Sequence, residues 1–240
     1  MTGNAGNGVV RITYDNSPIP TTFTTTEPTR SNTSSAISYS LTFSQNVNSV
    51  ADADFSNAGT ATGCVFSISG ASGTSFTLTV SSCSEGTLIP KVTANSVYGT
   101  VTSQNGPSSD ALTTTPITID RTAPTISSVT APANATYIPG NVPAFTVTFS
   151  ESVTVSGTPR LVLTVGTSTE YATFLNFSDS KTATFRYTVG LDPLELDSDG
   201  ISINTTLDLN GGAITDLATN AILDRTFTAP TLTSVLVAQP

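Results

Sequence analysis

The sequence predicts an all-β fold built from two tandem β-sandwich domains. Short alternations of apolar and polar residues recur along the chain, and no segment keeps a helical period for three turns. A phrase also repeats, because Thr122-Ala123-Pro124-Thr125 returns as Thr228-Ala229-Pro230-Thr231, with a fainter echo at Ser17-Pro18. The three prolines are evenly spaced, 106 residues apart. A period of this size matches the length of one β-sandwich domain.

The proline repeat sets the expected domain boundaries. We expect residues 1–15 to be a tail or the end of an upstream glycine-rich module. The first sandwich should then cover residues 16–121 and the second residues 122–228. Residues 229–240 are expected to be a C-terminal tail or the first strand of a following domain. Pro124 and the lack of a long Gly/Ser linker predict a stiff, end-to-end junction.

The first domain should open with an extended segment in residues 16–35, which are too rich in Thr and Pro for a helix. The first clear strand follows, where Ile37, Tyr39, Leu41 and Phe43 alternate with Ser and Thr. This period of two predicts a strand with one buried face and one solvent-exposed face. The remaining strands of this domain are expected at 64–69, 76–81, 88–93 and 117–120, with a polar loop at 99–110.

The second domain repeats the alternating pattern. Phe145, Val147 and Phe149 follow the same period, and an offset of 106 residues places Gln45 on Glu151. We expect its further strands at 160–165, 171–177, 182–189, 201–209 and 225–227, with an acidic loop at 191–200.

Composition restricts the function. Only 10% of residues are charged, the net charge is −9 and there is no His. This acidic balance argues against binding to nucleic acid or to an anionic membrane surface. Without His, a Ser-His-Asp triad, a Cys-His pair and a histidine-built zinc site are impossible. No apolar run is long enough to span a bilayer. The residue types alone still allow a hydrolase that uses a pair of carboxylates, but little else in the sequence favours one. We therefore predict that the chain is not an enzyme.

The two cysteines lie symmetrically about a predicted hairpin loop centred at residues 73–74. A disulfide between Cys64 and Cys83 is therefore expected, which favours an oxidising, extracellular location. Cys83 is out of phase with Leu78 and Val80, so a bulge near Ser81-Ser82 or pairing at a frayed strand end is required. The alternative is a pair of free, buried thiols.

Acidic residues are concentrated at a few predicted loops and strand ends. The loop at 191–200 contains four carboxylates and ends in the sequence Asp-Ser-Asp-Gly. Calcium prefers six to eight hard oxygen ligands, and loops at the end of a sandwich can bring such groups together. The twelve-residue loop of an EF-hand is missing. The alternative is that these are solvated turn residues. The candidate calcium ligands are Asp120, Glu151, Asp197, Asp199 and Asp216.

The second domain resembles bacterial Ig-like, cadherin-like repeats of large secreted surface proteins. The resemblance rests on 145–153, 157–161, 187–189, 199–201, 209–214 and 216–221. The first domain resembles a sister type through Phe43-Ser44, Asp54-Phe55, Gly86-Thr87 and 117–125. The sequence departs from the pattern at Gln45, and at Thr219, where a glycine usually precedes the Asn.

The resemblance implies two Ig-like β-sandwiches in a stalk or adhesin segment of a bacterial extracellular surface protein, with calcium near domain junctions. The expected role is a non-catalytic spacer whose partners are neighbouring Ig-like domains of the same parent chain. A carbohydrate- or protein-binding adhesin module and an accessory region of a secreted glycoside hydrolase are the alternatives. The ligand of such a module is not predicted.

Overall fold

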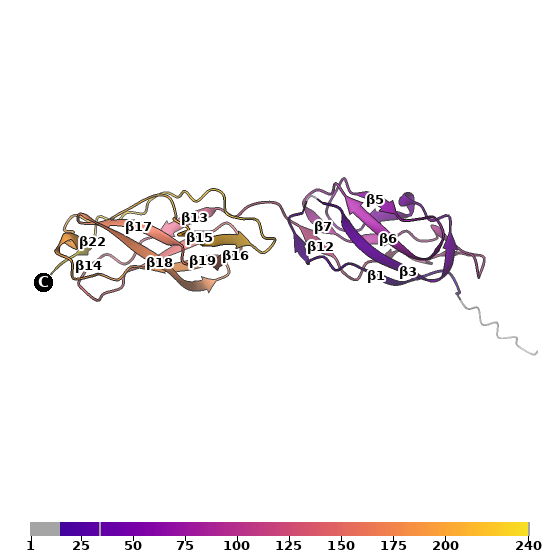
Figure 1. Ribbon diagram of the computed structural model, residues 1–240, viewed down its shortest axis with the longest axis horizontal. Helices are drawn as coiled ribbons and strands as arrows, with labels where there is room; N and C mark the ends of the chain where they lie inside the picture. The colour runs from indigo at the N-terminus through magenta and orange to yellow at the C-terminus, as the bar shows by residue number, and fades with distance from the viewer. Residues whose placement is uncertain (1–14, 34, 240) are drawn as a thin grey trace, which may run out of the picture. The chain divides into compact units, whose positions relative to one another are not determined.

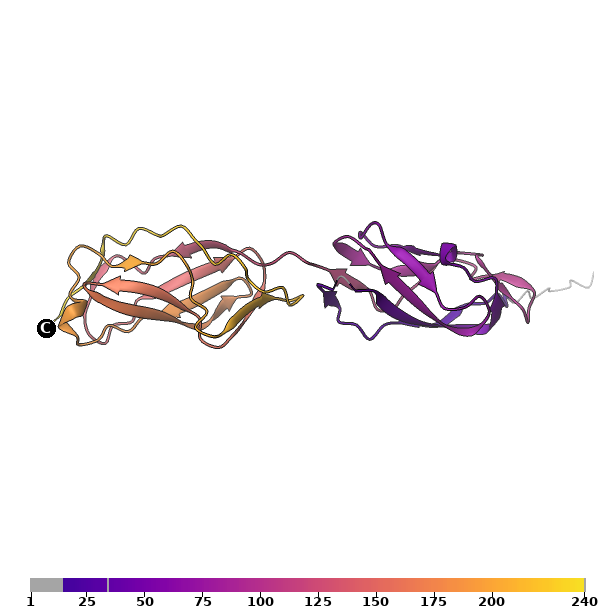
Figure 2. The same ribbon diagram turned by 45° about the horizontal axis from the view of Figure 1, so that its top comes forward.

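The computed structural model describes residues 15–33 and 35–239, and it is all-β (Figures 1 and 2). Within these residues the only helices are two short 3-10 turns, η1 (Asp52–Asp54) and η2 (Pro193–Glu195). The chain divides into two compact units, of which the first ends at Ile119 and the second begins at Asp120. The predicted tail at 1–15 lies outside the described residues, except for Asp15.

The first unit contains a six-stranded sheet of order β10-β9-β3-β6-β5, with β1 also paired to β3. Two three-stranded sheets complete it, of order β11-β8-β4 and β2-β12-β7. The bounds are β1 (Pro20–Thr24), β2 (Arg30–Ser31), β3 (Ile37–Asn48), β4 (Phe55–Asn57), β5 (Val65–Ile68), β6 (Gly73–Ser81), β7 (Gly86–Leu88), β8 (Pro90–Val92), β9 (Val97–Gly99), β10 (Gln104–Gly106), β11 (Ala111–Leu112) and β12 (Ile117–Ile119).

One apolar core lies between these sheets. Tyr39 and Leu41 of β3 are fully buried, and they belong to the same cluster as Leu88 of β7 and Ile117 of β12. The predicted alternation in β3 is confirmed, because its apolar residues are buried while Ser40 and its polar neighbours face solvent. Sheets that cover opposite sides of one core are consistent with a β-sandwich.

The second unit contains a six-stranded sheet of order β13-β15-β19-β18-β17-β20 and two strand pairs, β14-β22 and β16-β21. Its core includes Phe145, Phe185 and Leu163 of the large sheet together with Ile214 and Val235 of the pairs. The bounds are β13 (Ile126–Thr130), β14 (Ala135–Tyr137), β15 (Ala144–Phe149), β16 (Val153–Ser156), β17 (Arg160–Val165), β18 (Ser168–Asp179), β19 (Thr182–Arg186), β20 (Ser202–Ile203), β21 (Ala213–Asp216) and β22 (Val235–Val237).

The 106-residue spacing recurs in the strand registers. Pro20 pairs with Phe43 in the first unit, and Ile126 pairs with Phe149 in the second. Both pairings shift register one step later, at Thr22 and at Ser128. Residues 106 apart therefore occupy matching places in the opening strands of the two units.

Each unit closes with a parallel strand pair. In the first unit β2 pairs with β12, and Thr118 lies opposite Arg30. In the second unit β14 pairs with β22, and Leu236 lies opposite Thr136. The second strand and the last strand of each unit thus run in the same direction.

The structure differs from the expectation that residues 229–240 form a tail or start a following domain. Leu232, Val235 and Val237 are buried in the core of the second unit. The proline phrase precedes the closing strand β22 here, whereas its copy at Pro124 follows the closing strand β12. The phrase alone therefore does not mark a domain start.

Candidate functional site

Three of the predicted ligands meet in the second unit. One carboxylate oxygen each of Asp120, Glu151 and Asp216 lies within 4.8 Å of the others. Asp120 precedes β13, Glu151 follows β15, and Asp216 is the last residue of β21. Because Val153 at the start of β16 pairs with Asp216, the strand register brings Glu151 and Asp216 to the same end of the unit.

Asp216 is held by the turn that follows it. The Oδ1 atom of Asp216 accepts hydrogen bonds from the backbone N–H groups of Ala218 and Asn220, both at 2.8 Å. Its Oδ2 atom accepts from the side-chain nitrogen of Asn220 at 2.7 Å. Thr219 adopts φ +71°, the left-handed conformation that favours glycine. The turn therefore forms with Thr at the position where the family pattern has glycine.

The donor set suits a hard cation. Asp120 and Glu151 are half-buried, whereas Asp216 is 2% exposed. Three carboxylates at this distance repel one another unless a positive charge lies between them. Oxygen ligands are what Ca²⁺ requires, and water can complete its shell. The three residues could therefore hold calcium, whose charge would offset this repulsion.

The other two predicted ligands lie elsewhere in the same unit. Asp197 is buried, and its Oδ1 and Oδ2 accept from the backbone N–H groups of Gly200 and Gly166, both at 2.8 Å. Its backbone also pairs with Val237 of β22. Asp199 is exposed. The five candidate ligands therefore do not lie together, and the carboxylate of Asp197 accepts hydrogen bonds from backbone N–H groups of its own loop and of the turn after β17.

Sequence reasoning missed a buried carboxylate in this loop. Glu195 is buried and accepts hydrogen bonds from the Tyr187 hydroxyl and from the backbone N–H of Gly190. Burial of Tyr187, together with this bond, raises the pKa of its hydroxyl. The neighbouring Leu194 and Leu196 are 58% and 57% exposed. The available signal was the alternation of Leu and acidic residues between 194 and 197, in which Glu195 and Asp197 are the buried residues.

The described residues at the matching place in the first unit form no acidic cluster. Val47 is the residue of the first unit that matches Val153 of the second. Val47 pairs with Gly99, whereas Val153 pairs with Asp216, so Gly99 occupies the place of Asp216. Gln45 occupies the place of Glu151. A Cβ atom at Gly99 would lie 2.8–2.9 Å from the Gln45 carboxamide, so the Gln45 side chain fills the space beside this glycine.

The predicted disulfide between Cys64 and Cys83 is confirmed. Cys64 comes just before β5, and Cys83 follows the end of β6. Between β6 and Cys83, Ser82 adopts φ +59°. This left-handed residue interrupts the alternation of β6, which explains how Cys83 reaches Cys64 despite being out of phase with Val80.

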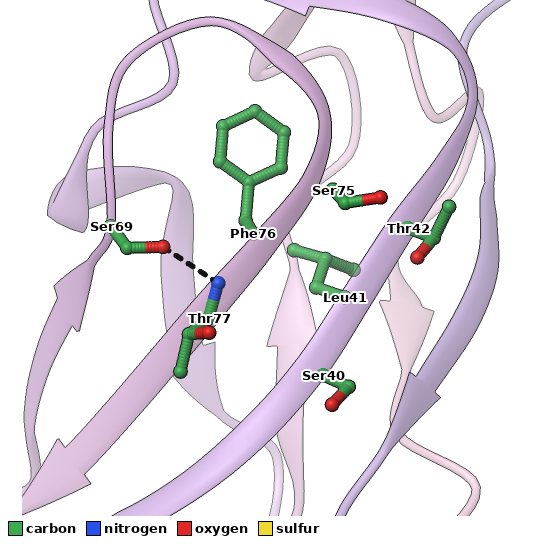
Figure 3. A pocket seen from close by; sticks show the side chains of 7 residues that line it. All are labelled: Ser40, Leu41, Thr42, Ser69, Ser75, Phe76 and Thr77. Atoms are coloured by element: carbon green, nitrogen blue, oxygen red, sulfur yellow. Dashed lines mark hydrogen bonds between the residues drawn. The ribbon is translucent and has the colours of Figure 1, made fainter.

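A shallow hollow lies over β3 and β6 of the first unit (Figure 3). It encloses about 340 Å³, and none of its seven lining residues is charged. Figure 3 shows the Ser69 hydroxyl accepting the backbone N–H of Thr77, at 2.7 Å. Hydroxyl groups without a neighbouring base or carboxylate offer hydrogen bonds but no general acid–base pair.

No protein-family model matches the chain, and no curated protein matches it.

Proposed function

We propose that this chain is a non-catalytic spacer of a bacterial extracellular surface protein, built from two Ig-like β-sandwiches joined end to end. The proposal combines the family resemblance with the all-β fold. Its strongest support is the parallel pairing of the second strand with the last strand in each unit.

Parallel closing strands determine where the chain enters and leaves a unit. A chain that runs in the same direction through its second strand and its last strand enters near one end of the unit and leaves near the other. In the second unit it starts at Asp120, beside Asp216 and Asn220. It finishes at Gln239, whose side-chain amide donates to the Gly190 carbonyl at 3.4 Å. Such units can be strung in series, and each adds its own length.

The disulfide supports an extracellular place for the chain. A bond between Cys64 and Cys83 persists in oxidising compartments and is reduced in most cytosols. Within the described residues no helix has the length and apolar character needed to cross a bilayer. The proposed partners are neighbouring Ig-like domains of the same parent chain.

Calcium binding at Asp120, Glu151 and Asp216 is the second part of the proposal. The site lies where the second unit begins, so a bound ion would tie Asp120 to the ends of β15 and β21. Bridging these segments would stiffen the start of the unit. Gln45 and Gly99 leave the first unit without an equivalent acidic cluster in its described part, so we expect one calcium site in the chain.

Small-angle X-ray scattering tests the spacer role. A 12-residue strand such as β3 is about 40 Å long, so two units in series should give a maximum dimension of roughly 80 Å or more. A value near half of this, with calcium present, would show that the units fold back on each other and would contradict the proposal.

A further inference from the structure

The first unit has a second hollow, at the end where its chain starts. It is lined by residues that precede β1, by Ser44 and Gln45 of β3, and by Val101 and Thr102 between β9 and β10. It encloses about 530 Å³, which is within the range of small-molecule sites. Because Gln45 occupies the place of Glu151, this hollow lies at the position where the second unit has the acidic cluster. The two units therefore differ in chemistry at matching ends.

The neutral carboxamide of Gln45 holds the wall of this hollow in place through hydrogen bonds. The Gln45 side-chain nitrogen donates to the Asn16 carbonyl at 2.9 Å and to the Thr102 hydroxyl at 3.0 Å. Its side-chain oxygen accepts the backbone N–H of Thr102 at 3.2 Å. Among the described residues, Asp15 is the one carboxylate that lines the hollow. A single carboxylate beside amide N–H donors is a poor calcium ligand set.

Two hydrogen-bonding side chains that line the hollow can still form hydrogen bonds with a ligand. The Ser17 hydroxyl is not one of them, because its oxygen atom is buried beneath the surface of the hollow. The Asn16 carboxamide makes no hydrogen bond within the described residues. The Ser44 hydroxyl accepts the Ile19 N–H at 3.2 Å and keeps its own proton to donate.

Asp15 adds an ionised hydrogen-bond acceptor to the polar groups that line the hollow. Its Oδ1 atom accepts the backbone N–H of Ser17 at 2.9 Å, and this bond lowers the pKa of the carboxyl group. Ile19 and Val101 border the hollow and are 49% and 73% exposed. The hollow therefore combines a carboxylate, a carboxamide and hydroxyls with exposed aliphatic side chains.

We propose that this hollow binds one unit of a neutral saccharide. Each sugar hydroxyl is both donor and acceptor, so vicinal hydroxyls can donate to Asp15 while accepting from Asn16 and Ser44. The C–H faces of the ring would pack on Ile19 and Val101. Asp15 and the net charge of −9 disfavour acidic sugars. This binding goes beyond the spacer role and does not depend on calcium.

The test is a titration of the full chain, in a calcium chelator, followed by the backbone amide signals in two-dimensional NMR. The probes are glucose, galactose, mannose and N-acetylglucosamine, with glucuronate as the charged comparison. We expect at least one neutral sugar to shift the amides of Asn16, Ser17, Gln45 and Thr102, and glucuronate to bind more weakly. Absence of shifts with all four neutral sugars, or shifts confined to other residues, would overturn the proposal.

Variants separate specific binding from general surface contact. Asn16→Ala should weaken binding three- to tenfold, the usual effect of one lost hydrogen bond, because the Asn16 bond to Gln45 uses the backbone carbonyl. Val101→Ser should also weaken binding. Asn176→Ala, at an exposed position of β18, is the matched control and should have no effect. Equal binding by Asn16→Ala and the parent chain would rule out the assigned hydrogen bond and the proposal with it.

Discussion

The side chain of Asn220 donates a hydrogen bond to the backbone carbonyl of Asp120 at 3.0 Å. The same nitrogen donates to Asp216 at 2.7 Å. One carboxamide therefore links the start of the second unit to the turn that carries the buried carboxylate. This link holds two of the three proposed calcium ligands in place.

Asn220→Ala should destabilise the second unit by about 1–3 kcal/mol, since the Asp120 carbonyl and the Asp216 carboxylate each lose a donor. Thermal unfolding of the full chain measures this change, with the transition of the first unit as the internal reference. Exposed Asn176 provides the matched variant, and Asn176→Ala should lie within about 0.5 kcal/mol of the parent chain. Equal stability of both variants would show that the Asn220 bonds do not contribute.

Calcium should stabilise the second unit selectively. At a concentration 100 times the dissociation constant, an ion that binds only the folded state adds about 2.7 kcal/mol. This corresponds to a rise of roughly 10 °C in the melting temperature of a unit of this size. Glu151→Gln should remove most of the rise, whereas Glu170→Gln, on β18 outside the cluster, should retain it. A calcium response that is the same in both variants would place the ion elsewhere.

Asp197 and Asp199 should behave differently although they are two residues apart. Asp197→Ala leaves the backbone N–H groups of Gly166 and Gly200 without their acceptor, and we expect a loss of about 2–4 kcal/mol. Asp199→Ala, at an exposed position, should change stability by less than about 0.5 kcal/mol. Chemical denaturation measures both variants. Neither variant should abolish the stabilisation by calcium, and loss of that response in Asp199→Ala would return this residue to the ligand set.

The disulfide should stabilise only the first unit. Cys64 and Cys83 are 19 residues apart, and a loop of this length corresponds to about 3 kcal/mol in the chain-entropy treatment. The double variant Cys64→Ala/Cys83→Ala should lower the unfolding free energy of the first unit by about this amount. The transition of the second unit should not move, and a matching fall in that transition would mean that the two units unfold together.

Local alternation and the 106-residue repeat were sufficient to predict the all-β class and the strand β3, because period two directly reports which side chains are buried. The disulfide was predictable from symmetry about a hairpin. The closing strand β22 was not, since its parallel partner β14 lies about a hundred residues earlier and leaves no local signal. Sequence also could not separate Asp216 from Asp197. Both are buried acidic residues, and only the strand register decides that Asp216 meets Glu151.

Single-molecule pulling on the two ends of the full chain tests the spacer role most directly. Tension applied to parallel closing strands from opposite ends loads their hydrogen bonds together rather than one by one. We predict two separate unfolding events, each of which needs more force than when a unit is pulled through two points at one end, such as residues 138 and 239 in the second unit. Unfolding of the second unit should release on the order of 400 Å of chain. Reduction of the disulfide should lengthen the chain released when the first unit unfolds by about 60 Å. Unfolding at equal force in both pulling geometries would contradict the proposed load-bearing spacer.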